Sequence, residues 1–217
     1  QLKRLNMITF DETIRESASN PFITCNQDGW RADPVAKNLK ASAWVGHTFE
    51  GNHCRELSED GKTLVSLIDI QAGGYDTAIT KQANSLRVDG LSPDAYLDSS
   101  IIMNIKGNGT RWWVGPKVDT RPCASNNNCP NYRTAWFENY IVENASDSPE
   151  AYHQRFLQKN AVYLGKTFQD GSSYRHYLKP HNDWAQYWAI RQKYRVSGKV
   201  HLYPIFQKWR QEGLPND

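Results

Sequence analysis

A glutamate and a tyrosine two residues apart are the side chains of this sequence best suited to chemistry. They are Glu138 and Tyr140, within the segment 136–144, where polar and apolar residues alternate. Alternate residues of a strand point to the same face, so both side chains would share one face of a sheet. A carboxylate positioned on a rigid sheet is a group that glycan-cleaving enzymes use. We therefore interpret Glu138 as a candidate catalytic residue and Tyr140 as a candidate substrate-binding residue.

A second alternating segment follows at 186–191 and carries another polar and aromatic set. Two such strands could line one cleft, which either cuts a polysaccharide or only holds one. Trp112 and Trp113 could add aromatic rings, although adjacent strand residues face opposite ways, so at most one of them would line a given face. Of the aromatic residues in these segments, Tyr140 and Trp188 are candidates for stacking on a sugar.

These residues must be held by a sheet, and the rest of the sequence predicts one. Strands are expected at 63–70, 99–105, 136–143 and 184–191, with a hairpin over 162–178 that turns at Asp170-Gly171. The segments 115–133 and 145–150 are expected to be irregular. Val200, Tyr203, Phe206 and Trp209 recur at helical spacing, which predicts one late helix over 200–211. The fold class is therefore all-β, a jelly roll or two-sheet sandwich with one late α-helix.

Length and composition fit one domain, 1–217, in which the first 20 residues could form an arm. The chain is 39% hydrophobic and 12% aromatic, so a sizeable core is expected. Its net charge of +3 is mild and its basic residues are scattered among acids, so nucleic acid is not an expected partner. No apolar run is long enough to cross a membrane. We expect a monomer whose partner is a polysaccharide or oligosaccharide.

The four cysteines suggest disulfides. Cys123 and Cys129 enclose a short polar turn and are expected to pair, which leaves Cys25 to pair with Cys54. A zinc site is the alternative, but neither pair has the short spacing of such sites. No metal and no cofactor are expected.

Other features suggest a secreted, extracellular protein. The sequence opens on Gln1 rather than Met, as a processed product does. Asn108 and Asn144 begin N-glycosylation acceptor triplets. With an even number of cysteines, these features favour an oxidising compartment.

Three segments also resemble a known family in the same order. Residues 137–144 resemble V-E-Y-Y-I-V-E-N, the nucleophile strand of glycoside hydrolase family 11 xylanases. Residues 164–174 are similar to that family's L-G-x-x-x-x-D-G-S-x-Y hairpin. Residues 186–200 resemble its Q-Y-W-S-V-R and R-x-S-G-x-V stretches, which precede a helix. The resemblance covers about residues 132–214.

The resemblance implies a β-jelly roll with a cleft and retaining hydrolysis of β-1,4-xylan by two glutamates. Glu138 matches the nucleophile, and Tyr140 matches a tyrosine of the cleft. Gln186 and Arg191 match polar residues near the nucleophile, and Trp188 matches the strand that carries them. The resemblance therefore implies that Gln186, Trp188 and Arg191 bind substrate.

The sequence departs from the family in two places. The family's thumb loop is replaced by the short segment 179–183, and no V-E-G-Y-like acid/base strand follows the late helix. The acid/base partner could be Glu12, Glu16 or Asp183, whereas Glu143 would point away from Glu138.

Two alternatives to hydrolysis remain open. The first is a non-catalytic carbohydrate-binding or host-interaction protein on the same fold, in which Glu138 is a framework carboxylate bonded to Arg191. The second is a polysaccharide lyase that uses His176 or His181 beside Tyr174 or Tyr177; the mild positive charge would suit an acidic polysaccharide.

Overall fold

Strands predominate in this protein, which confirms the predicted all-β class. The chain separates into two compact units, Gln1–Asn84 and Ser85–Asp217. A single domain remains a prediction. The computed structural model describes residues 10–20, 22–30, 34–37, 42–46, 48–60, 63–73, 76–80, 96–100, 111–120, 136–182 and 184–214.

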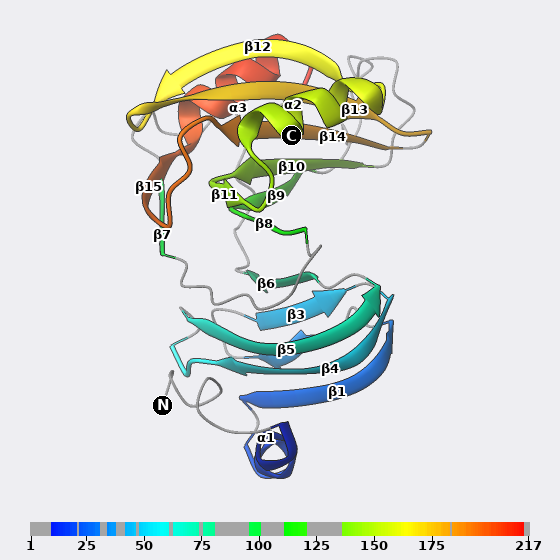
Figure 1. Ribbon diagram of the computed structural model, residues 1–217. Coiled ribbons are helices and arrows are strands. Elements are labelled where there is room, and N and C mark those ends of the chain that lie inside the picture. Colours follow the sequence, from blue (N-terminus) through cyan, green and yellow to red (C-terminus); the bar gives the residue numbers. More distant parts are fainter. Residues whose placement is uncertain are drawn as a thin grey trace. The chain divides into compact units, whose positions relative to one another are not determined.

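In its described residues, the first unit holds one helix and two three-stranded sheets, with the orders β1-β4-β5 and β2-β3-β6 (Figure 1). Its elements are α1 (Phe10–Ser17), β1 (Ile23–Trp30), β2 (Pro34–Lys37), β3 (Ser42–Gly46), β4 (Thr48–Leu57), β5 (Leu64–Gly73) and β6 (Asp76–Thr80).

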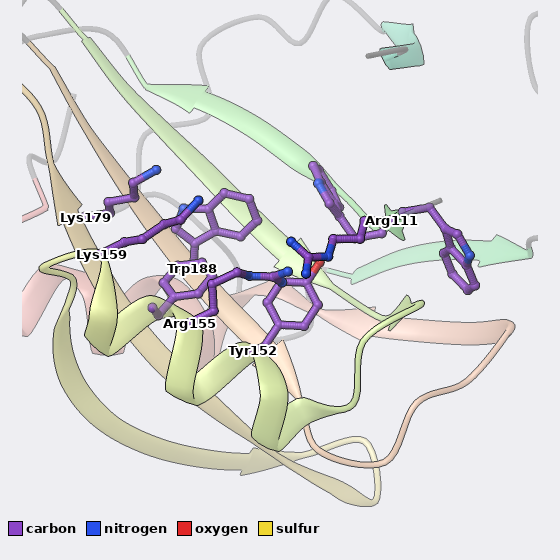
Figure 2. A pocket seen from close by; sticks show the side chains of 9 residues that line it. Arg111, Tyr152, Arg155, Lys159, Lys179 and Trp188 are labelled. Atoms are coloured by element: carbon purple, nitrogen blue, oxygen red, sulfur yellow. The ribbon is translucent and has the colours of Figure 1, made fainter. Parts of the chain in front are cut away.

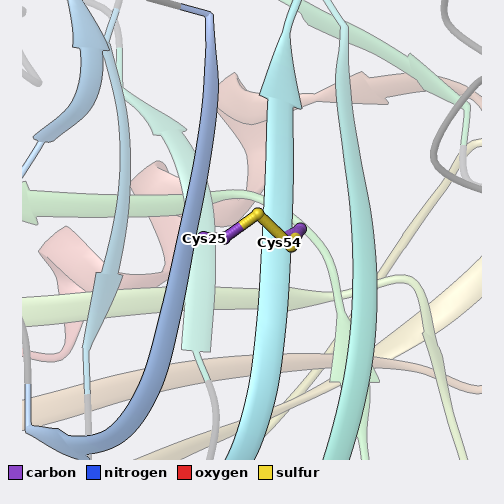
Figure 3. The surroundings of a disulfide bond; sticks show 2 residues. All are labelled: Cys25 and Cys54. Carbon is purple, nitrogen blue, oxygen red and sulfur yellow. A yellow bond between two sulfur atoms is a disulfide. The ribbon is translucent and has the colours of Figure 1, made fainter. Parts of the chain in front are cut away.

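A disulfide joins Cys25 and Cys54 across two neighbouring strands of this unit (Figure 3). The two cysteines stand directly opposite each other in the antiparallel ladder of β1 and β4. The predicted Cys25–Cys54 pair is therefore confirmed. The other predicted pair, Cys123 and Cys129, lies outside the described residues.

The second unit is built on a five-stranded sheet with the order β12-β13-β14-β10-β9. Two short two-stranded ladders, β11-β8 and β15-β7, belong to the same unit. The unit's elements are β7 (Tyr96–Ser100), β8 (Trp113–Val114), β9 (Lys117–Thr120), β10 (Trp136–Val142), β11 (Asn144–Ala145), α2 (Pro149–Gln158), β12 (Val162–Gln169), β13 (Ser172–Pro180), β14 (Trp184–Arg191), β15 (Ser197–His201) and α3 (Leu202–Gln211).

The predicted hairpin is present as β12 and β13, which pair antiparallel. Its turn residues, Asp170 and Gly171, have φ angles of 53° and 70°. A two-residue hairpin turn that matches the twist of its strands requires positive φ at both central residues. Aspartate and glycine adopt positive φ with less strain than most residues do. The short turn places β13 beside β12 and leads the chain on to β14.

Strands β10 and β14, which carry the candidate site, are direct neighbours and run parallel. In their register Glu138 is opposite Gln186, and Tyr140 is opposite Trp188. A parallel pair needs a long crossover, which here contains α2 and the β12–β13 hairpin. The two segments that sequence patterning singled out therefore share one surface.

The two faces of this sheet are both covered. On the α3 face, Phe137, Ile141 and Tyr187 pack with Ile205 and Trp209 of helix α3. On the α2 face, the strand residues pack with two side chains of helix α2. The members of this second cluster include Tyr140, Val142, Trp188 and Ile190 from the strands, and Tyr152 and Phe156 from α2.

A glycine allows the chain to cross close to the central strand. A Cβ atom on Gly115 would lie 1.7 Å from the carbonyl oxygen of Ile141, so no other residue fits there without a shift of the backbone. Next to it, the amide of Ile141 donates to the carbonyl of Pro116 at 2.9 Å. This contact links the segment between β8 and β9 to β10.

Several predicted elements need correction. Helices α1 and α2 were not predicted, and strand β9 lies within a segment that was expected to be irregular. The late helix is present, but it begins at Leu202 because residues 197–201 pair with β7 as strand β15. The strand predicted at 99–105 falls largely outside the described residues. After it, residues 113–114 form the short strand β8, which pairs with β11.

Candidate functional site

Glu138 lies on the α2 face of the sheet and is held by two hydrogen bonds. The hydroxyl of Tyr140 donates to Oε2 of Glu138 at 2.6 Å, and Nε2 of Gln186 donates to the same oxygen at 2.9 Å. The carboxylate is half-buried. Two donors from two strands orient the carboxylate and stabilise negative charge on Oε2.

The orientation of Gln186 is itself fixed by a further bond. The indole Nε1 of Trp188 donates to Oε1 of Gln186 at 3.2 Å. Because the amide oxygen accepts from the indole, its nitrogen is directed at Glu138. Trp188, Gln186 and Glu138 thus form a chain of hydrogen bonds, and both strands contribute to it.

Tyr140 and Trp188 are packed against each other. Their rings stack with centroids 4.1 Å apart, and Trp113 meets both rings edge-on at 5.2 and 5.5 Å. Phe156 of α2 meets Trp188 edge-on at 5.3 Å. Only 8% of Tyr140 and 9% of Trp188 remain exposed. These rings make a rigid wall, of which Tyr140 and Trp188 expose little surface.

A pocket of about 300 Å³ lies beside this wall (Figure 2). Both Trp112 and Trp113 line it, although the alternation of a regular strand predicted only one of them for any given face. Its lining is aromatic and basic. The lining residues are Arg111, Trp112, Trp113, Tyr152, Arg155, Phe156, Lys159, Lys179 and Trp188.

Helix α2 supplies much of this lining, and sequence reasoning missed it. Its N-cap is Ser148, whose side chain accepts a hydrogen bond from the amide of Ala151, and Pro149 occupies the first turn. A serine cap followed by proline is a helix-start signal. The spacing of Tyr152 and Phe156 places both on one helix face, so the signal was present in the sequence.

Arg191 does not neighbour Glu138, and this corrects the expectation from resemblance. It lies on the α3 face, where its guanidinium donates to the Tyr174 hydroxyl at 2.7 Å and lies 4.0 Å from the carboxylate of Glu143. The reason is parity: Gln186 and Arg191 are five residues apart, so they point to opposite faces. Glu143 also lies away from Glu138, as expected.

Three of the four histidine and tyrosine residues considered for a lyase are closed to solvent, and His181 is half-buried. His176, Tyr174 and Tyr177 are each 0% exposed. Burial lowers the pKa of His176 to about 3 and raises the pKa of Tyr177 to about 12. His181 stacks on Trp184 at 3.8 Å. This arrangement offers no accessible base and acid pair to a bound uronate.

The remaining predicted residues are dispersed. Glu12 and Glu16 lie on helix α1 of the first unit. Asn144 is half-buried in β11, and its side chain accepts from the amide of Ala145 at 2.8 Å. Asp183 and Asn108 lie outside the described residues. Among the described residues, no cluster of histidine, cysteine, aspartate and glutamate could hold a metal ion.

Comparisons with solved structures identify the fold that carries these residues. A crystal structure of a mutant ENZbleach xylanase matches 93% of this chain and 80% of its own with a TM-score of 0.60 at 17% identity. The family 11 xylanase from Neocallimastix patriciarum matches 88% of this chain and 85% of its own with a TM-score of 0.57 at 17% identity. The chain has a xylanase-like fold.

Sequence relatives agree with the xylanase-like fold. "Endo-1,4-beta-xylanase 2" of Humicola insolens is 33% identical over 89 residues, which are 37% of this chain and 38% of that protein. "Ethylene-inducing xylanase 4" of Verticillium dahliae is 30% identical over 154 residues, which are 58% of this chain and 66% of that protein. The matches thus leave a third or more of each relative uncovered. No protein-family model matches the chain.

Within the xylanase-like fold, the register brings one further carboxylate residue next to Glu138. Asp119 of β9 is the antiparallel register partner of Glu138. Sequence reasoning missed it because proline residues on both sides of 117–120 suggested an irregular segment. No helix in the described parts of the chain is long and apolar enough to span a membrane.

Proposed function

We propose that this protein is a retaining glycoside hydrolase that acts on a β-1,4-linked polysaccharide, with Glu138 as its nucleophile. One observation supports this most strongly: Tyr140 and Gln186 both donate to Oε2 of Glu138 from neighbouring strands. The similarity to two fungal proteins that are named as xylanases supports the choice of a β-1,4-xylan.

The proposed reaction has two steps at the anomeric carbon. A carboxylate oxygen of Glu138 attacks this carbon, and the bond to the leaving oxygen breaks while an acid protonates that oxygen. Water, deprotonated by the same residue, then attacks the glycosyl ester and releases Glu138. Tyr140 and Gln186 hold the carboxylate in place during both steps.

The acid/base residue must be a second carboxyl group about 5–5.5 Å from the nucleophile. Asp119 is the first residue to test, because it is the register partner of Glu138 on the adjacent strand. Glu12, Glu16 and Asp183 remain the candidates that the sequence suggested.

Two substrates separate the roles of nucleophile and acid. A dinitrophenyl xylobioside has a leaving group that needs no protonation, whereas xylan does need an acid. We expect the wild-type chain to cleave both, and Asp119→Asn to cleave only the dinitrophenyl substrate. Glu138→Gln should lose at least about a thousandfold in turnover on both substrates.

A matched control and a direct label complete the test. Glu150→Gln makes the same change at an exposed helix residue that bonds to Gln154 and Arg175, and it should keep full activity. A 2-fluoro derivative of the dinitrophenyl xylobioside should label Glu138, which peptide mass spectrometry would detect. Turnover of the dinitrophenyl substrate by Glu138→Gln at the wild-type rate would exclude Glu138 as nucleophile.

A non-catalytic carbohydrate-binding protein is the second candidate. It is favoured by helix α2, whose Tyr152 and Phe156 pack on the same face that carries Glu138. Binding of xylo-oligosaccharides with no turnover of either substrate would support this candidate over hydrolysis.

We also propose that the protein is secreted and acts as a monomer. The Cys25–Cys54 disulfide supports an oxidising compartment, because disulfides rarely persist in the cytosol. Fractionation of the producing cells tests secretion, and light scattering of the purified chain tests the monomer.

A further inference from the structure

The pocket beside Trp188 carries more positive charge than binding of a neutral sugar requires. Four of its lining residues are cationic: Arg111, Arg155, Lys159 and Lys179. Of the carboxylates in the described residues, Asp147 is the one that pairs with this set, through Arg155 and, at 3.9 Å, through Arg111.

The two arginines are already engaged by the protein. Arg155 forms its ion pair with Asp147 and lies over the ring of Tyr152, 4.3 Å from the centroid. Arg111 is mostly exposed at the pocket rim. These contacts hold the arginine side of the pocket in place without a ligand.

The two lysines are in a different situation. Lys159 extends from the end of α2, Lys179 extends from β13, and both reach the same side of Trp188 (Figure 2). No ion pair with a carboxylate is found for either lysine within the described residues. Burial, and then the charge of Lys159, lower the pKa of Lys179. Lys159 is exposed and Lys179 is half-buried, and two neighbouring ammonium groups are stabilised by an anion that binds between them.

Hydrogen bonds connect the wall of the pocket to the proposed nucleophile. In the sheet register Lys179 is opposite Gln186, and Gln186 is opposite Glu138. Trp188, which forms the pocket wall, donates to Gln186, which donates to Glu138. A sugar bound against Trp188 would therefore contact one end of the hydrogen-bond chain that reaches Glu138.

We infer that this pocket binds a uronic acid unit of the glycan, with the carboxylate between Lys159 and Lys179 and the sugar ring against the tryptophan wall. The aromatic lining from Trp112, Trp113 and Trp188 suits the apolar face of a sugar, and the lysines suit its carboxylate. The inference rests on the proposed function, because it names the type of glycan that the site around Glu138 takes.

Calorimetric titration with two matched ligands tests this inference. The ligands are xylotriose and xylotriose that carries one glucuronic acid, and the protein is the whole chain with Glu138→Gln, so that no turnover consumes them. We expect about tenfold tighter binding of the acidic ligand at about 0.01 M salt, and most of this difference should disappear at about 1 M salt.

Charge-removing variants locate the effect. Lys159→Gln and Lys179→Gln should each weaken binding of the acidic ligand about fivefold and leave binding of xylotriose unchanged. Lys166→Gln is the control, because Lys166 is an exposed lysine of the same unit on β12, away from the pocket lining.

Three results would overturn the inference. They are equal affinity for the two ligands, an acidic preference that survives both lysine substitutions, and inorganic phosphate that competes as well as the acidic trisaccharide, which would indicate an anion site without sugar recognition. Failure of the proposed function looks different: the acidic preference would remain while xylan and the dinitrophenyl substrate stay intact.

Discussion

The two faces of the five-stranded sheet carry the same kinds of residue but use them differently. On the α3 face, the charged groups near its edge neutralise one another: Oε1 of Glu143 accepts from Tyr174 at 2.7 Å, and Oε2 accepts from Arg195 at 2.5 Å. On the α2 face, Glu138 accepts from the neutral side chains of Tyr140 and Gln186. Lys159 and Lys179 lie near each other there, and neither pairs with a carboxylate within the described residues.

This difference separates charged groups that stabilise the folded chain from charged groups that suit a ligand. A buried carboxylate between two guanidinium groups is satisfied in the folded protein and has no need of a ligand. Cations that face each other beside an aromatic wall are better satisfied when an anion is present. Strand β10 thus carries a candidate reactive glutamate, Glu138, and is followed directly by a structural glutamate, Glu143. The same substitution at both positions tests this comparison.

The largest effect on stability should come from Glu143→Gln. The substitution removes the Glu143 carboxylate from the buried Arg191 and from Arg195, which keeps Asp170 at 3.8 Å. This loss should cost about 3 kcal/mol of unfolding free energy. Glu138→Gln should cost less than about 1 kcal/mol, because the amide can still accept from Tyr140 and Gln186. Urea denaturation of both variants measures the two values. Equal losses would show that Glu138 is a framework residue as well.

Acid should weaken the α3 face through His176. Its pKa is lowered to about 3 by burial and, secondarily, by Lys208, against an ordinary value of 6.5. On acidification the unfolded chain binds this proton first, so the contribution is fully present above about pH 6.5. It is lost as the pH falls toward 3, by roughly 1.4 kcal/mol per pH unit.

Unfolding free energies measured by urea denaturation between pH 7 and pH 4 would check this dependence. His176 bonds to Thr167 at 2.8 Å, and the amide of His176→Gln can replace that contact without titrating. The variant should therefore lose less stability over this range than the wild type does. An identical slope in both proteins would assign the acid sensitivity to other groups.

The smallest effect should come from the start of helix α2. Ser148→Ala removes the side-chain acceptor for the amide of Ala151 and should cost about 1 kcal/mol. Hydrogen exchange should accelerate in α2 but not in α3, because the two helices pack on opposite faces. Ser197→Ala, at an exposed position of β15, serves as the control. Faster exchange throughout the sheet would mean that α2 is part of one cooperative core with α3.

Much of this second unit could be predicted from the sequence. The period of two in 136–142 and 184–191 predicted β10 and β14, and the residues Asp170 and Gly171 predicted the hairpin turn. These signals are local, because they depend on strand parity and on backbone dihedral angles at single residues. The same parity could have shown that Arg191 points away from Glu138.

Other features were not predicted for different reasons. Helix α2 follows an Asn- and Ser-rich stretch typical of loops, and its capping serine and proline were outweighed by that composition. Strand β9 is short, and a strand of four residues has too little periodicity to be recognised. The pairing of Asp119 with Glu138 depends on β9 and therefore was missed as well.

The sequence by itself determined the alternation that puts Glu138 and Tyr140 on one face, and it determined the class of the fold. Only the tertiary structure decided which helix covers that face, which strand lies beside β10, and where the charges of Arg155, Lys159 and Lys179 converge. The physical reason is range: side-chain direction follows from the nearest residues of the chain. Pairing, burial and charge proximity depend on segments that are distant in sequence and meet only when the chain packs.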